Sequence, residues 1–289
     1  MRNVKYTVEK NFISSPKRFG ENYLYQVGKM HSGEGNEIEL HAHLNWYELT
    51  IVTSGNGYIY TNNKGVSISK GDIYLSFPSE FHMIRSSKES PLNFCFFAFH
   101  SESPLLCTEL DDIRERCMLA DCRVFRDERI RFLIDNLIIE LLEPDKYTED
   151  QSCAMIDQVI RYIIRDFQAV GKELTSQGVG KPEEFCYRIM NYIDTHIYTI
   201  TALSDLSDAM HYNYSYISNV FRQSTGETLS SYYRRRRLDT ARLLLIEGNL
   251  SITQIAELLN FSSVYTFSRA YKDYFGACPK MTKRKCASQ

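Results

Sequence analysis

The spacing of apolar residues changes about a third of the way along the chain. Between residues 22 and 100 they form short runs rich in β-branched and aromatic side chains, many alternating with polar ones, as in Tyr58-Ile59-Tyr60. From Glu109 onward they recur at i, i+3 and i+4. A period of two is typical of strands and a period near 3.6 of helices. The chain is therefore predicted to have a β-rich first part and an all-helical second part.

The β-rich part is predicted to be a small antiparallel barrel, a sandwich or jelly roll, in residues 1–107. Glycine and asparagine separate its runs, as in Ser54-Gly55-Asn56-Gly57. Evenly spaced short strands with such hairpin turns are typical of these folds. The predicted strands are Tyr47–Thr53, Gly57–Thr61, Gly65–Ser69, Asp72–Phe77, His82–Ser86 and Leu92–His100.

Residues 108–171 are predicted to form a helical segment with two amphipathic helices, Arg129–Glu143 and Asp150–Leu174. The first ends at Glu143 because Pro144 disfavours helix in the residue before it. Their apolar faces suit a homodimer contact, and packing against the barrel of the same chain is the alternative. Residues 172–182, KELTSQGVGKP, are rich in Gly, Ser and Pro and are predicted to be a flexible linker.

The C-terminal part, residues 183–289, carries the same apolar pattern twice. The first halves match at an offset of 49 residues and the second halves at 50. Each copy predicts two helices joined by a short turn, which is the helix-turn-helix plan. The units are predicted at residues 202–224 and 251–275, joined by a helix over Leu229–Glu247 that is about 30 Å long. The repeated positions are Leu203, Leu206, Tyr212, Ile217, Val220, Phe221 and Gly226, then Ile252, Ile255, Phe261, Phe267, Ala270, Tyr271 and Gly276.

Charge separates the two ends of the chain. The formal net charge is −2, but residues 211–289 hold 12 Lys and Arg against 5 Asp and Glu. A basic end on a slightly acidic protein is expected if that end meets a polyanion. The eight cysteines include no CxxC pair and are read as free thiols. The N-terminus has no apolar signal-peptide core, and no apolar run approaches the ~20 residues of a membrane span, so a cytoplasmic location is expected.

Histidines in the β-rich part follow a defined spacing. The chain reads G-x5-H-x-H-x4-E-x6-G from Gly35 to Gly55, then G-x6-P-x3-H from Gly71 to His82. Two histidines at i and i+2 of a strand face the same way. With a carboxylate and a third histidine they could hold a divalent metal, and the candidates are His41, His43, Glu48 and His82. The alternative is a hydrogen-bonded polar cluster in a barrel that binds an organic ligand.

The first of these motifs resembles that of the cupin family, and the second resembles it loosely because a glycine is missing between Pro78 and His82. In cupin enzymes the matching residues hold a metal. Aromatic residues expected inside the barrel suit a sugar or another small organic effector. The interior candidates are Trp46, Tyr58, Tyr60, Tyr74, Phe77, Phe94 and Phe96, and the predicted effector-binding residues are His41, His43, Trp46, Glu48, Tyr58, Tyr60 and His82.

The C-terminal repeat resembles the AraC family of bacterial transcription regulators from about Phe185 to Lys285. One departure is Asn260, which replaces the family's usual turn glycine and tolerates a left-handed backbone. The matching residues are Phe221-Arg222-x3-Gly226, Arg237-x3-Ala241-x2-Leu244, Ser251-Ile252-x2-Ile255-Ala256 and Phe261-x5-Phe267-Ser268-Arg269-x-Tyr271-Lys272-x3-Gly276-x2-Pro279.

The resemblance implies that double-stranded DNA is the partner of the second helix in each unit. Arg269 could pair with guanine, and an internal salt bridge is the alternative. Arg222 and Lys272 are expected at phosphates. The family implies no enzyme activity, a homodimer, an effector and RNA polymerase as a further partner. The predicted DNA-binding residues are Ser215, Ser218, Asn219, Arg222, Val264, Tyr265, Thr266, Arg269 and Lys272.

These observations predict a transcription regulator in which a small molecule, bound in the first domain, controls DNA binding by the second. The rival hypothesis is a metal-binding cupin, either an enzyme or a metal sensor, fused to a DNA-binding domain.

Overall fold

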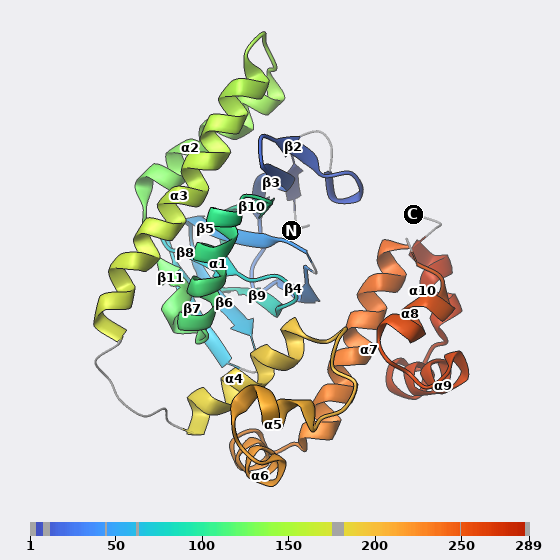
Figure 1. Cartoon of the computed structure of the whole chain (residues 1–289). Helices are drawn as coiled ribbons and strands as arrows, with labels where there is room; N and C mark the ends of the chain where they lie inside the picture. The colour runs from blue at the N-terminus through green and yellow to red at the C-terminus, as the bar shows by residue number, and fades with distance from the viewer. Residues whose placement is uncertain are drawn as a thin grey trace. The chain divides into compact units, whose positions relative to one another are not determined.

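The computed structural model describes residues 4–7, 12–43, 45–61, 64–174, 182–248 and 250–286. The chain divides into two compact units, Met1–Val179 and Gly180–Gln289. Strands lie in the first unit, and the second is built from helices, as the period of the sequence predicts (Figure 1). No helix in the described ranges is long and apolar enough to cross a membrane.

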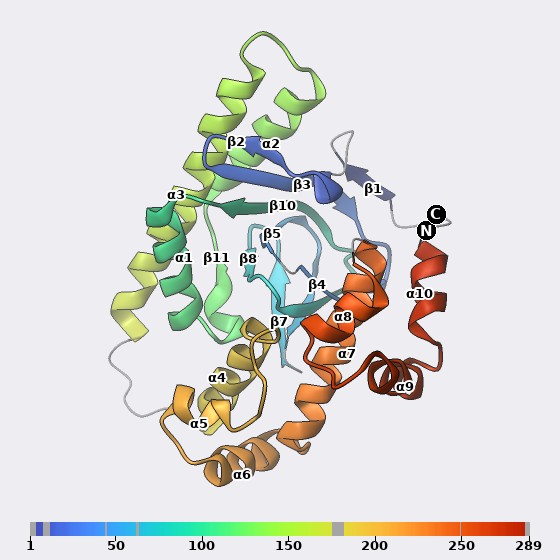
Figure 2. The same ribbon diagram turned by 45° about the vertical axis from the view of Figure 1, so that its right-hand side comes forward.

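Two antiparallel sheets form the first unit and confirm the predicted barrel. One has seven strands in the order β1-β3-β10-β5-β8-β11, with β2 beside β3. The other has four strands in the order β4-β9-β6-β7. Figure 2 shows β3 and β10 side by side. The strands are β1 Val4–Thr7, β2 Lys17–Phe19, β3 Asn22–His31, β4 Glu37–Ala42, β5 Tyr47–Ser54, β6 Asn56–Thr61, β7 Lys64–Ser69, β8 Ile73–Ser76, β9 Phe81–Ser86, β10 Asn93–Ser101 and β11 Val124–Phe125.

Alternation along β6 corrects the predicted interior of the barrel. Ile59 and Thr61 are buried, whereas Tyr58 is 48% exposed. Tyr60 is half-buried, and the Arg85 guanidinium lies 5.2 Å from the centre of its ring. Because side chains of a strand alternate between faces, Tyr58 and Tyr60 lie on the outer face. The prediction that these two tyrosines line the interior is wrong.

The other aromatic candidates are buried, but in two different cores. Tyr74, Phe94 and Phe96 belong to a cluster with Val52, Ile59 and Ile84, between the two sheets. Phe77 belongs instead to the core between the seven-stranded sheet and the helices. The single tryptophan, Trp46, is 6% exposed. The period of a strand marks which residues share a face, but it does not say which face is the interior.

Three helices cover the seven-stranded sheet: α1 Pro104–Arg116, α2 Glu128–Leu142 and α3 Thr148–Leu174. The apolar faces of α2 and α3 are largely buried against the sheet. These faces therefore pack on the barrel of the same chain, which was the alternative to a homodimer contact. The helical segment predicted at 108–171 also contains β11, which pairs with β8. It is therefore part of the same unit as the barrel.

The predicted linker falls mostly on residues 175–181, which lie outside the described residues. Its first residues, 172–174, are still in helix α3, and its last, Pro182, begins α4. The helix predicted over Asp150–Leu174 therefore ends at the expected residue, and it overlaps the first three residues assigned to the linker.

The described part of the second unit holds seven helices, of which α10 lies beyond the predicted units and was not expected. The joining helix α7 spans Leu229–Glu247 as predicted. Figure 1 shows α7 running between the helices of the two repeats. The others are α4 Pro182–Thr195, α5 Asp205–Met210, α6 Tyr214–Thr225, α8 Ile252–Leu258, α9 Val264–Phe275 and α10 Pro279–Cys286.

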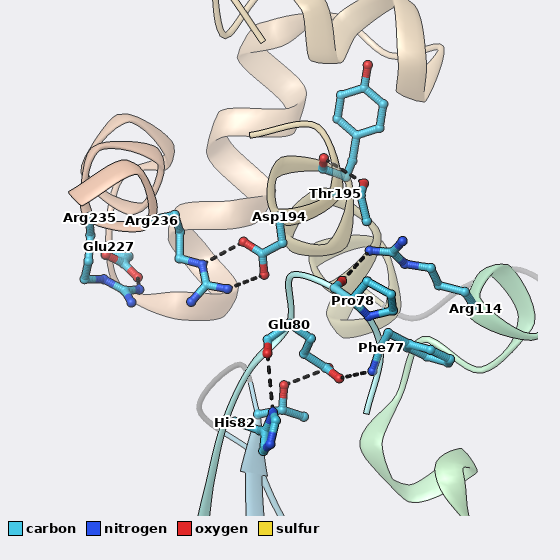
Figure 3. A network of polar contacts seen from close by, with 12 residues as sticks. Phe77, Pro78, Glu80, His82, Arg114, Asp194, Thr195, Glu227, Arg235 and Arg236 are labelled. Carbon is cyan, nitrogen blue, oxygen red and sulfur yellow. Dashed lines mark hydrogen bonds and ion pairs between the residues drawn. The ribbon is translucent and has the colours of Figure 1, made fainter. Parts of the chain in front are cut away.

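The four consecutive arginines of α7 have separate roles. Arg234 is exposed, and Arg235 binds Glu227 with 2.7 Å between Nη2 and Oε1. Arg236 donates two hydrogen bonds of 2.6 Å to the carboxylate of Asp194 in α4 (Figure 3). Both side chains of this pair are 4% exposed. Burial acts to lower the pKa of Arg236, but the Asp194 charge raises it above its usual value.

Breaking this buried pair should destabilise the second unit. Asp194→Ala leaves the Arg236 cation buried without a counter-charge, and we expect a loss of about 3–5 kcal/mol in the free energy of unfolding. Urea denaturation followed by circular dichroism measures it. The control Glu227→Ala removes the partner of Arg235, whose side chain is 27% exposed, and should cost no more than about 1 kcal/mol. Equal losses in the two variants would contradict the assignment.

Candidate nucleic-acid interface and ligand site

The first helix-turn-helix unit consists of α5 and α6. The turn begins at His211, whose φ is +57°, and ends at Asn213. The Asn213 side chain accepts a hydrogen bond of 2.8 Å from the Tyr216 amide and caps α6. Gly226 ends α6 with φ +77°, which is a left-handed cap.

The second unit, α8 and α9, repeats this geometry. Ser251 caps α8 together with Gln254, and Ser263 caps α9. Asn260 stands 49 residues after His211 and has φ +55°, so it adopts the left-handed backbone expected where the family has glycine. Its side-chain amide donates to the carbonyl oxygens of Tyr198 and Ile200, at 2.9 and 3.2 Å. The substitution therefore adds contacts between the second turn and the loop before the first unit.

The exposed faces of α6 and α9 contain the residues predicted to meet DNA. Phe221 and Phe267 point into the core and fix which faces turn outward. Ser218 is half-buried and the other eight are exposed: Ser215, Asn219, Arg222, Val264, Tyr265, Thr266, Arg269 and Lys272. The most exposed apolar residue among them is Tyr265, at 74%.

Arg269 has no carboxylate within salt-bridge distance among the described residues. The ion pairs found among the described residues of the second unit belong to Arg235 and Arg236 instead. The internal salt bridge considered as an alternative for Arg269 is therefore not formed among those residues, and its guanidinium stands on the exposed face of α9.

Tyrosines at the start of α6 form a surface that the sequence analysis missed. Tyr212 and Tyr216 stack with ring centres 5.1 Å apart, and both rings pack against Phe185 of α4. They are 48% and 47% exposed. The repeat suggested that Tyr212 is a core position, like its counterpart Phe261. The signal that could have found this surface is the density of tyrosine in Tyr212-Asn213-Tyr214-Ser215-Tyr216.

Arg237 connects the joining helix to the second unit. Its Nε donates to the carbonyl oxygen of Leu259 at 2.7 Å, and its guanidinium lies 3.8 Å from the centre of the Phe261 ring. Leu259 ends α8 and Phe261 follows the left-handed Asn260. Arg237 therefore holds the turn of the second unit against α7.

In the first unit, the four residues predicted as metal ligands do come together. One nitrogen or oxygen atom of each of His41, His43, Glu48 and His82 lies within 4.8 Å of all the others. His41 is in β4, directly opposite His82 in β9, and Glu48 is in β5 of the other sheet. Trp46 stacks on His43 with ring centres 4.9 Å apart. The cluster therefore joins the two sheets.

The electrostatics of the cluster favour a neutral imidazole at His41 and an ionised carboxylate at Glu48. Burial acts to raise the pKa of the Glu48 carboxyl, but His43 and His82 hold it well below its usual value. Desolvation, then His82 and His43, lower the pKa of His41 to about 3. Glu48 also accepts a hydrogen bond of 2.8 Å from the Gln26 amide.

A second buried charge pair lies beside the cluster. Arg123 is 2% exposed and donates to both carboxylate oxygens of Glu80, which also accepts from the Thr61 hydroxyl at 2.8 Å. Burial acts to raise the pKa of Glu80, but Arg123 lowers it below its usual value. The carbonyl of Glu80 accepts from His82 Nδ1 at 3.4 Å (Figure 3). This pair stabilises the loop that precedes His82.

A cavity of about 620 Å³ opens beside these residues in the first unit. Tyr25, which stacks on Trp46 with ring centres 4.3 Å apart, is in its wall. Arg114 of α1 also lines it; Nη2 of this side chain donates to the Pro78 carbonyl at 2.9 Å, and its buried Nε has no hydrogen-bond partner among the described residues. Other lining residues are Tyr23, Tyr47, His100, Glu102 and Asp111. The sequence analysis missed this cavity because its walls come from segments far apart in the chain.

Both units match models of known protein families. Residues 25–156 match the AraC-like ligand binding domain, and residues 206–285 match a helix-turn-helix domain. The chain belongs to the AraC family of transcription regulators. This is a family of regulators and not of enzymes, so the enzyme hypothesis is set aside.

Curated relatives of this AraC-family chain are described as HTH-type transcriptional regulators. An uncharacterized HTH-type transcriptional regulator of Staphylococcus aureus (strain MRSA252) is 24% identical over 245 residues, which are 82% of this chain and 31% of the relative. The regulator YobQ of Bacillus subtilis (strain 168) is 28% identical over 101 residues, covering 35% of this chain and 42% of YobQ. The chain thus spans about a third of the length of the staphylococcal relatives.

Among solved structures, wild-type ToxT from Vibrio cholerae strain SCE256 with an unsaturated fatty acid bound has a TM-score of 0.50. The likeness covers 92% of this AraC-family chain and 96% of ToxT at 14% identity. At that identity it shows a shared fold and no more.

Proposed function

We propose that this protein is a sequence-specific DNA-binding transcription regulator whose DNA binding is controlled by a small molecule held in its first unit. The observation that carries the proposal is the pair of helix-turn-helix units joined by α7, each with an exposed polar helix face. Nineteen residues of helix are about 28 Å long. Successive major grooves on one side of DNA are about 34 Å apart, so α6 and α9 suit neighbouring grooves.

The surface charge supports DNA as the partner of the second unit. Arg222 in α6 and Lys272 in α9 are exposed, and Arg234 is exposed on α7. Lysine and arginine at phosphates supply affinity that is independent of sequence. Asn219 and Arg269 carry the side-chain groups that form bidentate hydrogen bonds with adenine and guanine in the major groove. We therefore assign base reading to the exposed faces of α6 and α9.

Effector binding is assigned to the 620 Å³ cavity of the first unit, with a sugar or a related metabolite as its ligand. Its volume is within the range of about 300–1,000 Å³ of ligand sites. Tyrosine rings offer apolar faces to a sugar, while Arg114, Asp111 and His100 offer polar groups. Of the effector residues expected from sequence, Trp46 is connected to this cavity through Tyr25. Occupancy would shift the population of states in which the protein binds its operator.

A homodimer is proposed through α2. One face of this helix packs on the sheet, yet Phe132 and Ile139 on another face are 69% and 58% exposed. The two residues are seven apart and therefore lie on the same side, two turns from each other. Exposed apolar side chains in a row are typical of protein contacts. A dimer would place four helix-turn-helix units on one operator, and recruitment of RNA polymerase would follow at the promoter.

DNA binding can be tested with two matched variants. Arg269→Ala should cost about 1–3 kcal/mol on the operator and relax the preference at one base position. Lys272→Ala should instead weaken binding evenly across sequences and reduce the dependence of affinity on salt. Fluorescence anisotropy with a panel of base-substituted upstream fragments measures both. An even loss across all sequences for Arg269→Ala would exclude base reading by this residue.

Ligand binding in the effector cavity can be tested with substitutions in α1. Sugars and, because ToxT is known with a fatty acid bound, fatty acids are screened for a rise in Tm. A ligand of the cavity should lose about tenfold or more in affinity in Arg114→Met, since a charged hydrogen-bond donor is removed. Arg116→Met is the control, because Arg116 binds Asp112 and does not line the cavity. Equal affinity in both variants would place the ligand elsewhere.

Dimer formation can be tested by introducing negative charge on the exposed face of α2. Phe132→Asp with Ile139→Asp should convert the dimer to a monomer that keeps its fold, because neither side chain is buried in the subunit. Sedimentation equilibrium measures the mass. Asn136→Asp, on the same helix, is the control for added charge. A dimer that persists in the double variant would show that α2 is not the interface.

A further inference from the structure

Four side chains from both sheets of the first unit direct metal-binding atoms at one point. These are His41 of β4, His43 just after it, Glu48 of β5 and His82 of β9, with one atom of each within 4.8 Å of all the others. Three imidazole nitrogens and a carboxylate oxygen form a ligand set that suits divalent transition metals such as Zn²⁺, Fe²⁺ or Ni²⁺. We propose that this cluster binds one such ion.

The distances between side-chain atoms of the cluster suit ligands of one shared ion better than partners in hydrogen bonds. His43 Nε2 is 3.2 Å from Glu48 Oε2, and His82 Nε2 is 3.8 Å from Glu48 Oε1. Both nitrogens are buried, and neither has a hydrogen-bond partner among the described residues. Ligand atoms around a tetrahedral ion with bonds of about 2.0–2.1 Å are about 3.3 Å apart. One ion would therefore satisfy both nitrogens, with rotation of the rings closing the wider separations.

Backbone contacts orient two of the rings for metal binding. His41 Nδ1 lies 2.8 Å from the carbonyl oxygen of Glu39, and His82 Nδ1 lies 3.4 Å from that of Glu80. A carbonyl oxygen accepts a hydrogen bond only from a protonated ring nitrogen, so Nδ1 carries the proton in both rings. The lone pair on Nε2 of each ring is then available to a metal ion. Hydrogen bonds of this kind on the second ring nitrogen are the usual support of metal-bound histidine. The tautomer that a metal requires is thus the one that the backbone selects.

Burial argues against a purely structural polar cluster. His82 is 1% exposed and Glu48 is 5% exposed, and an unsatisfied buried polar atom costs about 1–3 kcal/mol. Further unpartnered hydroxyl oxygens belong to Ser76, directly opposite Glu48, and to Thr50, two residues along the strand. They lie on the same face as Glu48 and suit water molecules bound to an ion.

An ion at this point would link the two sheets. His41 and His82 belong to the four-stranded sheet and Glu48 to the seven-stranded one. Metal binding should therefore stabilise the folded first unit and alter the surroundings of Trp46, which stacks on His43. The proposal concerns this unit alone, and its test is independent of DNA binding by the second unit.

The 289-residue chain, stripped with a chelator and with those cysteines alkylated that react in the folded protein, is titrated with Co²⁺ and then with Zn²⁺. We expect one ion per chain, visible absorption bands of Co²⁺ with nitrogen and oxygen ligands, and a rise in Tm. Emission from Trp46, the single tryptophan, should be quenched by Co²⁺ at the same stoichiometry. Absence of stoichiometric binding by the alkylated wild-type chain would overturn the proposal without recourse to a variant.

A double substitution locates the ion. His41→Gln with His43→Gln changes two half-buried rings, and should weaken Co²⁺ binding by more than about 100-fold. His31→Gln, a histidine of the same unit outside both the cluster and the cavity, should bind as the wild type does. An unchanged circular dichroism spectrum, including the strand signal of the first unit, shows that the double variant is folded. Unchanged Co²⁺ affinity in a folded double variant would place the ion elsewhere and refute the assignment.

Discussion

The pairing of buried charges constrains both units of this protein. In the second unit, Arg236 and Asp194 neutralise each other between α7 and α4, where water does not reach them. A buried arginine without a carboxylate would be far too costly, so α4 has to pack at one rotation against α7. The joining helix is thereby fixed at the point from which both helix-turn-helix units extend. Arg237, the next residue, then fixes the turn of the second unit.

The same constraint acts in the first unit with different residues. Arg123, which follows α1, reaches into the barrel and pairs with Glu80, and this connects the helical segment to the loop before β9. His82 lies two residues after Glu80, and its Nδ1 contacts the Glu80 carbonyl oxygen. The position of the histidine cluster therefore depends on a charge pair that belongs to neither the predicted metal ligands nor the core. Stability and the candidate ligand site are coupled at this loop.

The amino-acid sequence was sufficient for the local structure of the second unit. Repeated apolar positions, Ser and Asn caps and left-handed glycines are all read from short windows of residues, and α7 begins and ends where its period predicts. Even the left-handed turn at Asn260 follows from its side chain. The roles of Arg235, Arg236 and Arg237 in α7 could not be predicted, because their partners lie 8 to 42 residues away.

For the first unit, the sequence alone determined the six strands β5 to β10, the His-x-His spacing and the two helices, since each depends on the period of neighbouring residues. Tertiary structure decided which face of β6 is inside, and so moved Tyr58 and Tyr60 to the outer surface. It also decided that β11 completes a sheet from within a helical segment, and that Tyr25, Tyr47 and Arg114 share one cavity. A period tells which side chains point the same way. Only the packing of distant segments tells what they point at.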